Sequence, residues 1–246
     1  YYLQGYFPFK EIYHDCEVIQ WTEGNCRYRK IITPYGELKE CWEYMETTFS
    51  EAPVEHLMKS EDDIPAMIYF YDHISYEPDY TFAETRNRQI GDQGASLCYL
   101  PKSPFMQLVA LDAGIMTVTI LAYSAPERFE ELLASMKRSF DQAAQIAVNS
   151  PAELLMIPEN LSSEMVGEMF FEKYMKDYQV EWTTKIREAG KYSFIHIDGT
   201  LKGLLKQESL VGFSVLEALT PSPVGDMSIH EMIPMLEESK SIFWGG

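Results

Sequence analysis

The sequence lacks the features that mark membrane, dinucleotide-binding and zinc-finger proteins. No run of 18 or more apolar residues occurs, so no membrane-spanning helix is expected. No Gly-x-Gly-x-x-Gly motif is present, and this argues against the phosphate-binding turn of a doubly wound sheet. The four cysteines never stand at Cys-x-x-Cys spacing, so they predict no cysteine-based zinc site and are expected to be reduced thiols of a cytoplasmic protein.

Basic residues are also scarce. The chain has 20 Lys plus Arg against 38 Asp plus Glu, which gives a net charge of −18. A surface of this sign repels nucleic acid and anionic lipid, so binding to either is not expected. It also disfavours a substrate with many carboxylates, unless the binding pocket is locally basic.

The sequence has no initiator Met and no charged-then-apolar leader, so no secretory signal is expected. Its first residues are already aromatic, and its last residues read as a strand and the turn after it. We therefore expect a fold that is incomplete at one or both termini.

Two regions follow from the residue patterns. Residues 1–60 predict a β-meander, with three strands between 16 and 45, that covers the main body of the same domain. Residues 61–246 predict short strands in alternation with helices, the pattern of a parallel α/β sheet. The expected strands are 66–71, 95–100, 153–157, 192–197, 214–219 and 242–244; the expected helices are 80–93, 104–113, 126–148, 165–189, 201–210 and 229–239. Six strands fit a TIM (β/α)8 barrel that lacks material at its ends, and a doubly wound open sheet is the alternative.

Polar residues follow three of these strands. His196 and Asp198 end the strand 192–197, Glu159 and Asn160 follow 153–157, and Glu217 and Asp226 accompany 214–219. In a barrel the carboxyl ends of the strands share one face, where a metal or acid–base site would form. Each residue also has a structural interpretation, as a helix cap or a hydrogen-bonded core group. Outside this set, Tyr35 stands at the turn 33–36 and is a candidate to enter a cleft.

Several short motifs in a fixed order resemble the uroporphyrinogen decarboxylase superfamily over residues 30–246. They are Thr-Pro-Tyr-Gly at 33–36, Pro-Glu-Asn-Leu-Ser-Ser at 158–163, Ile-His-Ile-Asp-Gly at 195–199, Glu-Ala-Leu-Thr-Pro-Ser-Pro-Val-Gly-Asp at 217–226 and Ile-Phe-Trp-Gly-Gly at 242–246. The resemblance implies a (β/α)8 barrel and one of two activities. One is decarboxylation of uroporphyrinogen III, in porphyrin biosynthesis. The other is methyl transfer involving a corrinoid protein, with zinc held by a His-x-Cys pair and a later Cys.

The long Thr-Pro-Ser-Pro run looks more like the methyltransferase-type members. His196 matches the zinc-binding His, whereas Asp198 stands where the first Cys would be, which favours a harder metal site. The resemblance therefore implies a metal-assisted methyltransferase that acts with a corrinoid protein and a small methoxyl or methylamine compound. Its site would comprise catalytic Glu159, His196 and Glu217, substrate-binding Tyr35, Asn160 and Asp226, and zinc on His196 and Asp198.

A homodimer is also possible by the same resemblance. The alternatives are a uroporphyrinogen III decarboxylase and a diverged barrel that binds a ligand without catalysis.

Overall fold

The computed structural model describes residues 5–245, which divide into two compact units. Unit 1 contains residues 5–10, 77–103 and 143–245, and unit 2 contains residues 11–76 and 104–142. The two-stranded ladder of β1 (Phe9–Tyr13) and β6 (Ile74–Pro78) contains residues of both units. The expected division of one domain into a cover region, residues 1–60, and a barrel, residues 61–246, stays a prediction.

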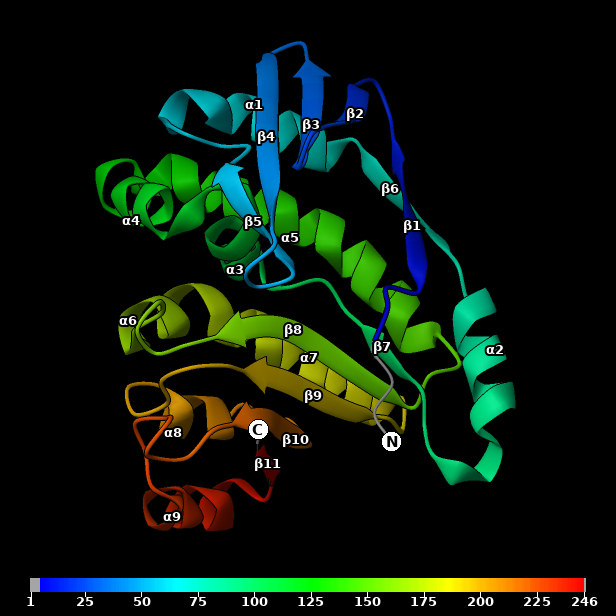
Figure 1. Cartoon of the computed structure of the whole chain (residues 1–246), viewed down its shortest axis with the longest axis vertical. Helices are drawn as coiled ribbons and strands as arrows, with labels where there is room; N and C mark the ends of the chain where they lie inside the picture. Colours follow the sequence, from blue (N-terminus) through cyan, green and yellow to red (C-terminus); the bar gives the residue numbers. More distant parts are fainter. Residues whose placement is uncertain (1–4, 246) are drawn as a thin grey trace. The chain divides into compact units, whose positions relative to one another are not determined.

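Unit 1 is built on a five-stranded parallel sheet, which confirms the predicted α/β class (Figure 1). Its strands are β7 (Leu97–Tyr99), β8 (Leu154–Leu161), β9 (Tyr192–Ile197), β10 (Val215–Leu219) and β11 (Ile242–Gly245). The strands lie in the sheet in the order in which they occur along the chain. A doubly wound sheet reverses its strand order partway, and these five strands do not.

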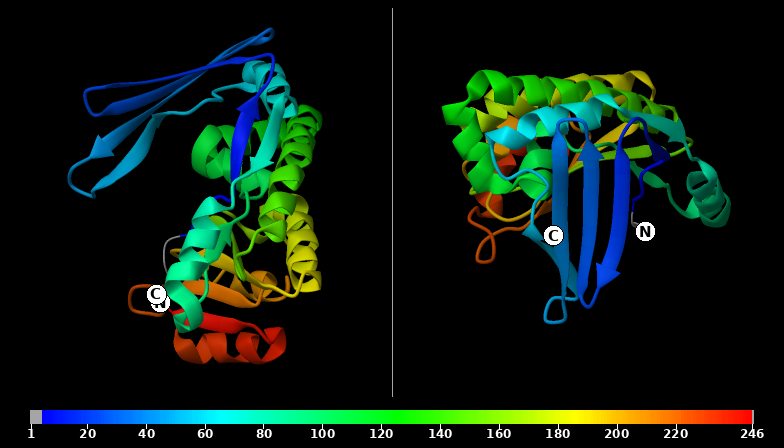
Figure 2. Two further views of the ribbon diagram at one scale, coloured as in Figure 1. Left: turned by 90° about the vertical axis from the view of Figure 1, so that its right-hand side faces the viewer. Right: turned by 90° about the horizontal axis from the view of Figure 1, so that it is seen from above.

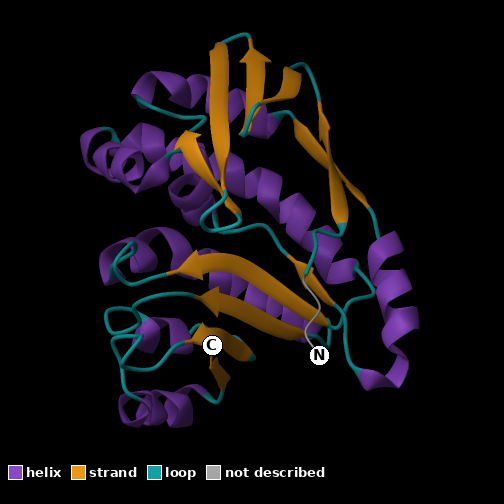
Figure 3. Cartoon of the chain, in the orientation of Figure 1, coloured by secondary structure: helices purple, strands orange, loops and turns teal. Residues whose placement is uncertain are grey.

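The strands of unit 1 alternate with helices (Figure 3). These are α2 (Thr81–Ile90), α6 (Glu168–Phe170), α7 (Lys176–Glu188), α8 (Leu205–Ser209) and α9 (Ile229–Ser239), with a 3₁₀ turn at Gly91–Gln93 and a π-helical turn at Phe171–Met175. Helix α7 lies against β8 and β9 and buries Trp182 and Ile186 completely (Figure 1). Helix α9 begins where predicted, because Ser228 and Glu231 cap each other's backbone N–H groups.

Unit 2 carries a four-stranded antiparallel sheet in the order β2-β3-β4-β5 (Figure 2, right). The strands are β2 (Glu17–Glu23), β3 (Cys26–Thr33), β4 (Gly36–Met45) and β5 (Ser50–Glu55). The predicted three-stranded meander is confirmed and β5 extends it. The turn between β3 and β4 is closed by Thr33, whose hydroxyl donates to the carbonyl of Gly36 at 2.9 Å.

The helices of unit 2 are α1 (Ile64–Asp72), α3 (Pro104–Gln107), α4 (Gly114–Ser124) and most of α5 (Pro126–Asn149), with a 3₁₀ turn at Glu61–Asp63 and a π-helical turn at Leu108–Asp112. The predicted helix 126–148 is confirmed as α5, and its residues Phe129, Leu132 and Met136 are fully buried. No helix within residues 5–245 is long and apolar enough to cross a membrane. All four cysteines are free thiols.

A buried polar network lies in unit 2. The Arg29 guanidinium donates to the Glu40 carboxylate at 2.7 Å, and the hydroxyl of Tyr71 donates to the carboxyl group of Asp112. The Gln107 amide donates to the other Asp112 oxygen at 3.2 Å. Asp112 is 1% exposed, so these groups replace the water that a surface carboxyl would have.

The predicted strand 66–71 is wrong, because these residues lie inside helix α1. The buried positions Ile64, Met67 and Tyr71 recur at spacings of three and four, which is the helical period. The predicted helix 165–189 is broken into α6, a π-helical turn and α7, and the predicted helix 201–210 shortens to α8.

Candidate active site

Two of the predicted residues meet at the carboxyl ends of neighbouring strands in unit 1. His196 of β9 and Glu217 of β10 are register partners, and in-register residues of parallel strands point to the same face of the sheet. The Nδ1 atom of His196 lies 2.5 Å from Oε2 of Glu217. Their side chains are 30% and 20% exposed, so the pair is half-buried and still reachable from solvent.

The backbone at the end of β10 is irregular. The register with β11 shifts between Glu217 and Leu219, and Ala218 between them has φ +68°. Such a bulge ends regular pairing and re-aims the neighbouring side chains, and it is common beside active sites. An alanine in this left-handed region is held there by its surroundings.

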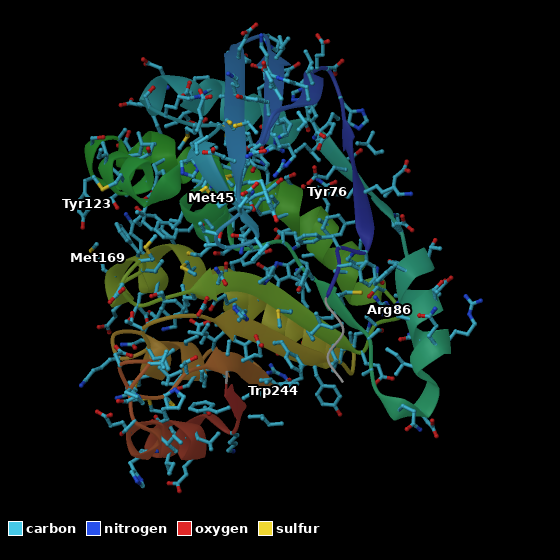
Figure 4. The ribbon with its side chains drawn as sticks, in the orientation of Figure 1. Met45, Tyr76, Arg86, Tyr123, Met169 and Trp244 are labelled. Atoms are coloured by element: carbon cyan, nitrogen blue, oxygen red, sulfur yellow. The ribbon has the colours of Figure 1, made fainter. Side chains whose placement is uncertain are left out.

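A buried apolar cluster continues from the pair along the same face of the sheet. Phe194 precedes His196 by two residues, and its ring lies 6.4 Å from that of Trp244, which is labelled in Figure 4. Phe194 packs in a buried cluster with the inward residues of the neighbouring strands: Leu97, Met156 and Val215. The His196–Glu217 pair therefore stands at the polar end of a row of buried apolar residues on this face of the sheet.

Glu159 lies in a different cluster. It is fully buried, and its carboxyl accepts the backbone N–H of Ser103 at 3.1 Å and the side-chain amide of Gln179 at 3.4 Å. Burial raises the pKa of the Glu159 carboxyl, and the charge of Lys102 offsets part of this effect. The structure does not pair Glu159 with His196 or Glu217.

Three residues of this second cluster were not expected from the sequence: Lys102, Gln179 and Glu208. Glu208 is fully buried, and neither of its carboxyl oxygens has a hydrogen-bond partner within residues 5–245. Burial and the nearby Glu159 raise the pKa of Glu208 well above its ordinary value. Lys102 donates to the carbonyl of Pro158, and burial lowers the pKa of its ammonium group. Only Lys102 had a visible signal in the sequence, because it lies in the loop that follows strand β7.

Asp226 joins two strand-exit loops. Its carboxylate accepts the backbone N–H of Leu201 at 2.7 Å and that of Lys202 at 3.1 Å, so it holds the loop after β9 against the loop after β10. Only glycine fits at position 225 beside it, because a Cβ atom there would lie 1.9 Å from the carbonyl oxygen of Thr220. The clamp thus depends on both residues.

The remaining predicted residues are exposed. Asp198 follows β9 and Asn160, with φ +56°, lies at the irregular end of β8. Tyr35 is 64% exposed and belongs to unit 2. The substrate-binding roles expected for Tyr35 and Asn160 stay predictions.

The described residues do not fit the predicted zinc site. A zinc site needs at least three protein ligands, and within residues 5–245 no three His, Cys, Asp or Glu side chains gather closely enough to hold a metal ion. His196 turns one ring nitrogen to Glu217, which leaves a single nitrogen for a metal, and Asp198 is exposed. We therefore derive no chemical step through zinc.

Comparisons with known proteins agree with the family resemblance. The model of the family described as "Uroporphyrinogen decarboxylase (URO-D)" matches residues 96–224, which is just over half of the chain. A solved structure, a methyltransferase from Methanosarcina mazei, is similar with a TM-score of 0.52 at 12% identity, over 79% of this chain and 55% of that one. The chain thus spans little more than half the length of that structure, and at this identity the likeness concerns the fold. No curated protein matches the chain.

Proposed function

Because this chain belongs to the uroporphyrinogen decarboxylase family, we propose that it is an enzyme that moves a methyl group between a small methoxyl or methylamine compound and a corrinoid protein. The observation that carries the proposal is the His196–Glu217 pair, which sets a proton-carrying imidazole at the carboxyl ends of parallel strands. The chain also shares its fold with a solved protein that is described as a methyltransferase.

We also propose that the five parallel strands are part of a (β/α)8 barrel. Their sequential order supports this, because each strand of such a barrel pairs with its neighbours in sequence. Active sites of these barrels lie at the carboxyl ends of the strands, and His196 and Glu217 stand there.

The pair suits a reaction in which a heteroatom must leave. A carboxylate only accepts hydrogen bonds, so Glu217 fixes the proton of the His196 ring on Nδ1 and holds the ring plane. The second nitrogen, Nε2, then exchanges the reacting proton. When bound, the corrinoid of the partner protein supplies the acceptor for the methyl group.

The balance of the step is simple. The bond between the methyl carbon and the substrate oxygen or nitrogen breaks, and its electron pair stays on the heteroatom. His196 donates the Nε2 proton of its imidazolium form to that atom, which makes it a better leaving group. The methyl carbon would form its new bond to the reduced corrinoid of the partner protein, which would supply the electron pair of that bond. In the opposite direction, the neutral ring takes the proton back.

A second candidate reaction is decarboxylation, which the description of the matched family favours. Here the bond to the carboxylate carbon breaks, carbon dioxide leaves, and the remaining carbon takes the proton from His196. The same pair serves both reactions, so the substrate must decide between them.

The test is an assay of the purified protein with a panel of methoxyl and methylamine compounds and reduced cobalamin as the corrinoid, followed by its absorbance change. Uroporphyrinogen is assayed in parallel. H196Q and E217Q are expected to lower kcat by about 10²- to 10⁴-fold, since positioned proton transfer contributes this much. E172Q, which alters an exposed glutamate paired with Lys176, is the matched control and is expected to keep full activity.

Methyl transfer that H196Q and E217Q leave intact would refute the role of the pair. Turnover of uroporphyrinogen with no methyl transfer would replace the leading reaction by the second one.

A further inference from the structure

Unit 2 contains a cavity of about 290 Å³ that none of the proposed chemistry uses. Its lining includes Tyr35 from the β3–β4 turn, Tyr69 and His73 from the end of α1, and Glu131 from α5. All of these lining residues belong to unit 2.

Aromatic rings form one wall of this cavity. The rings of Tyr35 and Tyr69 lie 5.6 Å apart at 52°, and the His73 ring stacks on Tyr69 at 3.8 Å and 20°. The Tyr69 hydroxyl donates to the carbonyl of Asp15 at 3.2 Å, which fixes the ring. Tyr35 is 64% exposed, so a large aromatic surface is open to a ligand.

The polar groups of the cavity that remain open are acceptors. His73 Nδ1 lies 2.7 Å from the carbonyl oxygen of Tyr69, and a carbonyl only accepts, so Nδ1 carries the ring proton and Nε2 is left as an acceptor. The Glu131 carboxylate is exposed and has no hydrogen bond or ion pair with another described side chain.

The other charges of the lining are already paired. Arg128 donates to Glu61 at 2.6 Å, and Asp72 accepts from Arg138 at 2.8 Å. The unpaired charge of the cavity is therefore the negative charge of Glu131, beside aromatic faces. The chain's net charge of −18 further concentrates cations at its surface.

We propose that this cavity binds a small organic ammonium ion, with the cation against the tyrosine rings and Glu131 as its counter-charge. Aromatic faces attract cations through the ring quadrupole, and a carboxylate nearby adds to that attraction. An anion would meet Glu131 and find no unpaired cation among the described lining residues. The inference concerns unit 2 alone and does not depend on the reaction proposed for unit 1.

The test compares choline with 3,3-dimethyl-1-butanol, which has the same shape and no charge. Binding to the purified protein is followed by ligand-observed NMR and calorimetry. Choline is expected to bind about 10-fold more tightly than the neutral compound, because only choline carries the positive charge that the aromatic rings and Glu131 attract. Y35A and E131Q are each expected to weaken choline binding by about 5- to 10-fold.

E127Q is the matched control, because Glu127 lies in the first turn of α5 and does not line the cavity. It is expected to bind choline as the wild type does. Equal binding of the neutral compound would mean an apolar hollow and overturn the proposal. If E127Q and E131Q weakened choline binding equally, the binding would reflect only the general negative charge of the surface, and the proposal would be wrong. The proposal would also be wrong if the wild type did not bind choline.

Discussion

Replacing Asp112 by Asn is expected to remove a pH-dependent part of the folding stability. Burial raises the pKa of the Asp112 carboxyl from 3.8 to about 6, although the charge of Arg29 and the hydrogen bond from Tyr71 act in the other direction. A pKa that is higher in the folded state means that folding favours the protonated form. The Asp112 contribution to the free energy of unfolding is thus fully present below about pH 4 and is lost as the pH rises through about 6.

The size of this contribution follows from the two pKa values. Each pH unit between the two pKa values corresponds to about 1.36 kcal/mol. The free energy of unfolding therefore falls by about 3 kcal/mol between about pH 4 and 6. Asn carries no titrating proton, and D112N should show no such loss. D112N also lacks the attraction between the Asp112 carboxylate and Arg29. This changes its free energy of unfolding above about pH 6 by a constant amount, so the wild type and D112N still differ in how that free energy changes with pH.

The assay is urea denaturation at a series of pH values from about 3.5 to 8, followed by tryptophan fluorescence. Trp21 and Trp42 lie on the sheet of unit 2 and report on its unfolding. Subtracting the D112N curve from the wild-type curve cancels the other titrating groups. D62N, at an exposed aspartate of the 3₁₀ turn, is the control and should run parallel to the wild type. A wild-type minus D112N difference that stays constant across this range would refute the reasoning.

Three further predictions concern single side chains. G225A is expected to lower the thermal stability and to disturb the loops of the candidate active site, because its Cβ would lie 1.9 Å from the carbonyl oxygen of Thr220. Circular dichroism melting measures the first effect, and the methyl-transfer assay of the proposed function measures the second. G114A is expected to destabilise unit 2 by about 1–3 kcal/mol in urea denaturation, since φ is +76° there and the new Cβ would meet the His56 ring at 2.8 Å; an unchanged midpoint would contradict this. E208Q is expected to stabilise the protein more at pH 8 than at pH 5. Burial raises the pKa of the Glu208 carboxyl, so the wild-type protein loses folding stability as the pH rises, and Gln at this position does not titrate. Equal gains in melting temperature at both pH values would contradict this.

The regular elements of unit 1 could be predicted because their signals are local. Strand β9 is an apolar run between Gly190 and Gly199, and α9 begins at a capping box, so both have the bounds that the residue pattern gives. Helix α1 could not be separated from a strand, because its six apolar residues in succession satisfy both periods. Helix α4, apolar on most sides, has no periodic signal and was not expected.

The grouping of the site residues depended on information that a single sequence does not contain. Strand register places His196 beside Glu217, and it also places Ile157 beside Ile195, on the opposite face from Phe194 and His196. Glu159 follows Ile157 by two residues and hydrogen-bonds to the helix layer instead. The residue pattern shows which groups stand at strand ends, and only the register shows which of them share a face.

The position of the His196–Glu217 pair has a consequence for engineering. Both residues belong to strands that are fixed by their neighbours on either side, whereas Asp226 and Gly225 belong to loops. In the proposed reaction the proton donor on the strands is therefore separable from the loops that follow them. Replacing the segments 198–204 and 220–227 together by those of another family member keeps each loop with its partner across the Asp226 hydrogen bonds. This exchange should change the substrate preference and leave His196 in place.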